Sequence, residues 1–136
     1  MLDFKPATLV SEDRRQTFLP DLFGLHRLIF AENFIYALME LLSPLDYGGG
    51  FWNFFEMAGQ PLYLAPTSKP RFRITWEGNG YQGEVSADAA GIIATMFALS
   101  HLSFRFEDDR FSEAYARLYE FAAGHPEAGE IFQAID

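Results

Sequence analysis

The sequence predicts an α+β fold: a single domain over residues 1–136, in which an antiparallel β-meander of about four strands packs against helices from both ends of the chain. Apolar residues recur at helical spacing before residue 43 and after residue 86, and alternate at strand spacing in part of the middle third. No repeat, linker or low-complexity segment divides the sequence. A chain of 136 residues, 49% of them hydrophobic, can bury a core without a metal or a disulfide.

Two helices are expected before the strands. Ser11 is followed by two acids, which predicts an N-cap and the first turn of a short helix ending near Pro20. Residues 25–42 are the longest helical candidate, because apolar side chains from Leu25 onward recur every three or four residues. Their polar stripe is narrow, which indicates a mostly buried helix, and Pro44 stops it.

Three consecutive glycines, residues 48–50, come next. A phosphate-binding loop follows a strand and opens a helix, whereas these glycines follow a helix and lead into a strand, with no lysine nearby. We therefore expect a backbone joint. The strand after it is apolar on both faces, which predicts a strand covered on both sides. One face carries Phe51, Asn53, Phe55 and Met57, and the other Trp52, Phe54 and Glu56.

Residues 71–77 alternate between apolar and polar side chains, and the tight turn predicted at residues 78–80 leads into residues 81–85, so the two segments should form a hairpin. Ser86 can then cap a long helix with Asp88 in its first turn. Gly91 inside this helix indicates close packing against a neighbour. Residues 112–123 form an amphipathic helix ending at Gly124, and a last helix runs to residue 135.

Composition excludes several classes of protein and site. The chain has no cysteine, so it has no disulfide framework, thiolate zinc site or cysteine nucleophile. Its net charge of −9 argues against tight direct DNA binding, which needs lysines and arginines to neutralise phosphates. We expect no secretion signal, no membrane span and a cytoplasmic protein. The oligomeric state is not determined by the sequence.

No residue set predicts an active site. The three histidines, His26, His101 and His125, are far apart in the sequence and have no metal-ligand spacing. Ser86 is explained by capping, and the adjacent acids Asp108 and Asp109 are typical of a solvated loop. We therefore expect neither an enzyme nor a bound metal or cofactor.

The acidic side chains gather in the C-terminal part of the chain. Residues 84–136 contain ten acids and three arginines, whereas the first 83 residues contain nine acids and seven bases. A solvated acidic face, a contact surface for a protein partner and imitation of DNA all remain open, with DNA imitation the least favoured because the excess is mild. If the acids contact a partner, the first candidates are Glu127, Glu130 and Asp136, followed by Asp108 and Asp109.

A nucleic-acid-binding module is the alternative function. Lys69, Arg71 and Arg73 lie close in sequence to aromatic residues, a combination that binds single strands by charge and base stacking. Three bases are few against the acidic excess, so a core strand is the favoured interpretation of the aromatics.

Four segments together resemble the ArdB/KlcA family of antirestriction proteins. They are FLPDLFG at residues 18–24, YGGGFWNFFEM at 47–57, GNGYQGEVSADAAGIIATMFAL at 78–99 and HPEAGEIFQAID at 125–136. The resemblance implies a protein of a plasmid or other mobile element that counteracts type I restriction and modification in the host, with an unusual α+β fold. It also implies that the protein is not a DNA mimic. The partner would be the type I restriction complex or an associated host factor; blockage of the complex, interference with its DNA translocation and action through another factor stay open.

Overall fold

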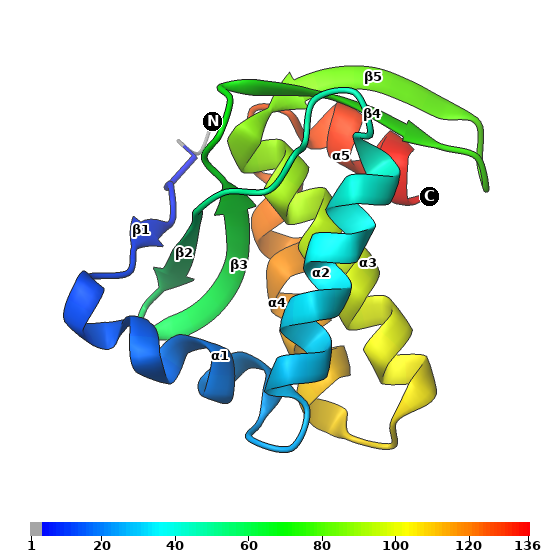
Figure 1. The fold of residues 1–136 in the computed structure, drawn as a ribbon. Coiled ribbons are helices and arrows are strands. Elements are labelled where there is room, and N and C mark those ends of the chain that lie inside the picture. The colour runs from blue at the N-terminus through cyan, green and yellow to red at the C-terminus, as the bar shows by residue number, and fades with distance from the viewer. Residues whose placement is uncertain (1–3) are drawn as a thin grey trace.

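The computed structural model describes residues 4–136 (Figure 1). Within this range the chain forms five α-helices, one 3₁₀-helix and five strands. In chain order they are β1 (Thr8–Leu9), η1 (Glu12–Arg14), α1 (Arg15–Phe23), α2 (Leu28–Leu42), β2 (Trp52–Met57), β3 (Gln60–Pro66), β4 (Arg71–Trp76), β5 (Tyr81–Ser86), α3 (Ala87–Arg105), α4 (Asp109–Ala123) and α5 (Ala128–Ile135).

The strands form two antiparallel sheets. β1, β2 and β3 make one sheet, with Phe54 opposite Leu64, and β4 and β5 make the other, with Ile74 opposite Gly83. The predicted α+β class, the antiparallel pairing and the hairpin turn between β4 and β5 are confirmed. The structure adds a division between the sheets, since β3 does not pair with β4. Pro66 ends β3 and Pro70 immediately precedes β4, and neither residue has an N–H to donate to a ladder.

Helix α3 lies at the centre of the molecule (Figure 1). It packs against β3, α2, α4 and α5, and it also contacts the β4–β5 sheet. Gly91 allows its close approach to β3, because a Cβ at this position would lie 2.3 Å from the Leu64 carbonyl oxygen. The predicted cap and the predicted close packing are both confirmed, and the Ser86 hydroxyl accepts from the Ala89 N–H at 3.1 Å.

By length and composition α3 could span a membrane, which the sequence interpretation did not anticipate. However, 61% of its most apolar 18-residue window is buried inside the protein. Most of its apolar side chains therefore belong to the core, where they pack against the surrounding helices and strands.

Three N-terminal details differ from the predictions. The Ser11 side chain makes no capping bond, and η1 leads directly into α1. Helix α1 continues through Pro20 to Phe23 and ends at Gly24, whose φ is 78°. Helix α2 begins at Leu28 rather than at residue 25, because residues 25–27 form the turn that follows Gly24. Leu25, expected in the core, is consequently 77% exposed.

The glycine run before β2 is the predicted backbone joint. Gly49 and Gly50 adopt φ values of 101° and 109°, which L residues rarely populate. In β2 the face with Trp52 and Phe54 is buried and the opposite face is half-buried, so the strand is covered less completely than predicted. Phe51 lies outside the strand and is exposed.

Candidate contact surfaces

The predicted contact acids on the last helix are bonded within the molecule. Glu127, just before α5, accepts hydrogen bonds from the Ser86 backbone N–H at 2.9 Å and from the Ser86 hydroxyl. Glu130 accepts from the Tyr81 hydroxyl at 3.1 Å, and burial together with this bond raises the pKa of Tyr81 to about 12. These two carboxylates join α5 to β5 and to the start of α3.

The chain end is joined to the β4–β5 hairpin in the same way. The Asn79 side-chain amide donates to the backbone oxygens of Gln133, Ala134 and Asp136, and its carbonyl accepts from the Tyr81 N–H. Asp136 itself is exposed. Among the three C-terminal candidates, Asp136 is the one whose side-chain carboxylate forms no hydrogen bond or ion pair within residues 4–136.

Asp108 and Asp109 lie at the other end of α4, and both are exposed. Asp108 is the N-cap of α4 and accepts from the Arg110 N–H at 2.9 Å, while Asp109 occupies the first turn. A helix of 15 residues is about 22 Å long, and α4 therefore separates the pair from Glu127 and Glu130. The structure does not bring the five candidate acids together into one surface.

Beside Asp108 and Asp109 lies an exposed apolar surface that sequence analysis missed. We call it the aromatic end. It lies where the start of α2 meets the end of α3, at the bottom of Figure 1, and Phe104 in it is 90% exposed. It consists of Leu25, Arg27, Ile29, Phe30, Phe104, Arg105 and Phe106.

Two arginines of the aromatic end pack on rings. The Arg27 guanidinium lies 3.8 Å from the centre of the Phe106 ring, and that of Arg105 lies 5.1 Å from the centre of the Phe30 ring. Neither arginine forms an ion pair with an acid of residues 4–136. Exposed aromatic and arginine side chains are the types enriched at the energetic centres of protein interfaces.

The bases proposed for nucleic-acid binding are paired with acids. Arg73 donates two side-chain hydrogen bonds and its backbone N–H to Asp46, at 2.8 to 2.9 Å, and Lys69 contacts the same carboxylate at 3.4 Å. The hydrogen bonds from Arg73 hold the pKa of Asp46 well below its usual range. Arg71 pairs with Glu84 at 2.9 Å. These charges tie the Asp46 loop and the two strands of the second sheet together, so the basic patch is largely neutralised.

A partly buried polar network joins the connection between α4 and α5 to α3 and β3. Asp88 accepts from the Tyr63 hydroxyl at 2.5 Å and lies 2.8 Å from His125 Nε2. The other ring nitrogen of His125 accepts from the Glu127 N–H at 2.9 Å, so Nε2 carries the proton and donates to Asp88. The side chain of His125 is 5% exposed. His125 is thus a core histidine held in place by hydrogen bonds at both of its ring nitrogens. Burial and the hydrogen bond to Asp88 raise the pKa of Tyr63.

Within residues 4–136 no group of three or more histidines and carboxylates could hold a metal ion. The His125 network supplies one histidine and one carboxylate, and no serine or threonine hydroxyl hydrogen-bonds to its ring. The arrangement is that of a structural clamp. The exposed contact surfaces are the remaining candidates for a functional site.

Comparison with known proteins gives the family. The profile of a family described as antirestriction protein matches residues 45–136. The antirestriction protein KlcA of Escherichia coli is 42% identical over 134 residues, which cover 96% of this chain and 94% of KlcA. The chain belongs to the antirestriction protein family. The resemblance stated from the sequence is confirmed.

Two further relatives support the family assignment. The putative antirestriction protein YubI of Escherichia coli K12 is 36% identical, with 97% of each chain covered. A solved structure of the KlcA and ArdB group aligns with a TM-score of 0.84 at 40% identity and covers 100% of this chain and 99% of its own. The solved KlcA and ArdB proteins are described as having a novel fold and antirestriction activity against type I DNA restriction systems in vivo but not in vitro.

Proposed function

We propose that this protein protects DNA from type I restriction systems inside the cell, as a single-domain, non-enzymatic inhibitor acting in the cytoplasm. The observation that carries the proposal is the full-length similarity to KlcA, together with a solved relative reported to act against type I systems in vivo. That relative does not act in vitro, which favours a mechanism involving a further host component. The partner is either the restriction complex or such a factor.

Protein contact, rather than imitation of DNA, is the proposed mode of action. A DNA mimic needs a continuous array of unpaired acids that matches the regular spacing of phosphates. Here Glu127 and Glu130 are occupied by internal hydrogen bonds, and Asp108 and Asp109 lie at the far end of α4. The distribution of acids thus supports a discrete contact surface.

Asp108 and Asp109 are the better contact candidates of the five acids. Both are exposed and adjoin the aromatic end, so a partner that carries basic and apolar side chains would meet both features in one interface. Glu127, Glu130 and Asp136 form the second candidate surface, in which Asp136 is exposed and the two glutamates are half-buried.

Plating unmodified phage on a strain that restricts it tests the proposed function. Expression of the protein is expected to raise plating efficiency toward that of a non-restricting strain. A plating efficiency that stays at the restricted level while soluble protein is present would overturn the proposal.

The contact surface is tested in the same assay with charge-neutral variants. Asp108→Ser keeps an N-cap acceptor, and combined with Asp109→Asn it removes two charges without removing the cap. We expect reduced protection from this double variant. Glu12→Gln with Asp13→Asn removes two exposed charges from η1 and serves as the matched control. Equal protection by both double variants would eliminate the Asp108–Asp109 surface.

A further inference from the structure

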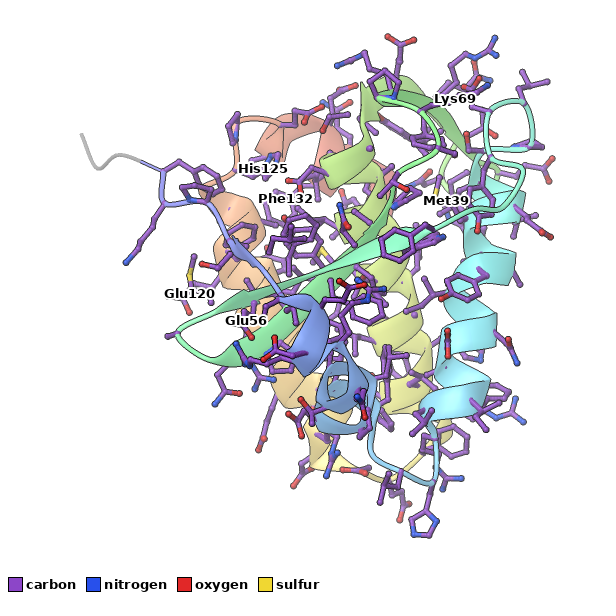
Figure 2. All side chains as sticks on the ribbon, turned by 60° about the vertical axis from the view of Figure 1, so that its left-hand side comes forward. Met39, Glu56, Lys69, Glu120, His125 and Phe132 are labelled. Carbon is purple, nitrogen blue, oxygen red and sulfur yellow. The ribbon has the colours of Figure 1, made fainter. Side chains whose placement is uncertain are left out.

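A groove between the N-terminal segment, the β2–β3 hairpin and α4 has no role in the contacts described above. It has a volume of about 530 Å³, within the range of small-molecule sites. Figure 2 shows Glu120 on α4 beside the turn between β2 and β3, where the groove lies. Among its lining residues are Phe4, Met57, Ala58, Leu62, Arg117 and Phe121.

The walls are mainly apolar. Phe4 and Phe121 pack against each other with ring centres 5.2 Å apart, and Met57 and Leu62 contribute aliphatic surface from the hairpin. An apolar ligand body would therefore exchange water for hydrocarbon and ring contacts on entering the groove.

Arg117 adds a cation to this apolar groove. Its Nε is buried and finds no hydrogen-bond acceptor within residues 4–136, and its guanidinium forms no ion pair there. Buried polar atoms are normally hydrogen-bonded, so an unsatisfied one needs an explanation. A carboxylate is the group whose two oxygens match a guanidinium edge.

The charges around the groove favour an anion by one unit. Lys5 and Arg117 are the cations that line it, and Glu120 is the one carboxylate. Lys5 and Glu120 are both exposed to water, whereas Nε of Arg117 is not. Arg117 is therefore the cation whose attraction for a carboxylate would be least weakened by water.

The lip of the groove carries an unusual backbone conformation. Ala58 has a φ of 51° and is the one non-glycine residue among residues 4–136 with positive φ. It forms a two-residue turn with Gly59, whose φ is 77°, between the paired residues Met57 and Gln60. Asparagine is the usual residue at the first position of such a turn, and alanine is disfavoured there. The turn alone does not explain alanine, but a small side chain keeps this part of the groove open.

We propose that the groove binds a small amphipathic carboxylic acid, with its apolar body between Phe4, Leu62 and Phe121 and its carboxylate on Arg117. The site is independent of the contact surfaces, which lie on other parts of the molecule. It gives this antirestriction protein a small-molecule ligand in addition to its proposed protein partner.

The test uses a matched pair of probes, 4-phenylbutyrate and its neutral amide, in NMR titrations of the labelled full-length protein. The acid is expected to bind at least about tenfold more tightly than the amide, the ratio typical of one charge-assisted hydrogen bond. Shifts are expected at the amides of Met57, Gln60 and Phe121. Equal affinity of the two probes, or no shift at these amides at millimolar concentration, would overturn the proposal.

Variants separate the carboxylate contact from the apolar one. Arg117→Gln is expected to reduce the ratio of acid to amide affinity to about one. Ala58→Asn suits the turn better, so the thermal midpoint should not fall, but its larger side chain narrows the groove and both probes should bind more weakly. Ala58→Gly is the matched control, which relaxes the turn and leaves the groove open. Unchanged binding in both Arg117→Gln and Ala58→Asn would contradict the site even if one of them altered stability.

Discussion

Acidic side chains near the two ends of α4 have opposite roles. At the C-terminal end, Glu127 and Glu130 are half-buried and hold α5 against Ser86 and Tyr81. At the N-terminal end, Asp108 and Asp109 are exposed beside the aromatic end. An excess of acids in a sequence therefore does not identify the acids available to a partner. Composition counts acids that stabilise the fold and acids that are free for contact in the same way.

The largest effect on stability is expected from Glu127→Ala. It leaves the Ser86 N–H without its acceptor at the start of α3, and we expect a loss of about 2 kcal/mol in the free energy of unfolding. Urea unfolding followed by circular dichroism measures the change. Glu127→Gln, which keeps one acceptor oxygen, should lose less. A Glu127→Ala protein as stable as the wild type would show that Glu127 does not stabilise the start of α3 through Ser86.

A smaller loss of stability is expected when the N-cap of α4 is removed at Asp108. Asp108→Ala removes the side-chain acceptor for the Arg110 N–H and should cost about 1 kcal/mol, whereas Asp108→Ser should cost little. The same urea measurement applies. If serine and alanine destabilise the protein equally, the effect comes from lost charge rather than from the cap.

The hydrogen bond from Tyr81 to Glu130 predicts that the free energy of unfolding depends on pH in the alkaline range. Burial and Glu130 raise the pKa of Tyr81 to about 12, above its ordinary value of 10. The folded state therefore holds this proton more tightly than the unfolded state, and its contribution to stability is complete below pH 10 and lost between about pH 10 and 12. Glu130→Gln should lower the pKa of Tyr81, measured by phenolate absorbance. An unchanged titration would show that Glu130 does not bond the phenol in solution.

The smallest effect on stability is expected at the aromatic end. Phe104→Ser removes a side chain that is 90% exposed, so the free energy of unfolding should change by no more than about 0.5 kcal/mol. Protection in the phage assay should nevertheless fall if this end contacts the partner. Tyr119→Ser, also at an exposed aromatic but on α4, is the control. Full protection by Phe104→Ser would show that Phe104 does not contact the partner and would leave Asp108 and Asp109 as the contact candidates at this end.

Much of the fold was predictable from local patterns. The alternation in residues 71–77, the cap at Ser86 and the stop at Gly124 each depend on a few neighbouring residues, and the structure has the corresponding elements. The predicted start of α2 at residue 25 was wrong. Leu25 fits the helical period, but Gly24 directs the chain into a turn before the helix begins. Periodicity describes which faces are apolar but not where the backbone bends.

The groove and the polar network were not predictable in the same way. Arg117 is one arginine on an amphipathic helix, and no neighbour in sequence indicates that its Nε lacks an acceptor. The signal that could have drawn attention to the groove is the Ala58-Gly59 pair, where a two-residue hairpin turn normally has asparagine first. Asp88 and His125 are likewise separated by 37 positions and meet only in the folded chain.

Strand β1 and the division into two sheets were not predicted from the sequence. The sequence was sufficient to predict the α+β class, the order of the five α-helices and of strands β2 to β5, and the family. These follow from propensities and periodicities within short segments and from the resemblance of those segments to known proteins. Tertiary structure alone decided which acids are bonded, which arginines lack acids and where a groove forms. Such properties depend on the distances between groups far apart in the chain, and packing of α3, α4 and α5 against the two sheets sets those distances.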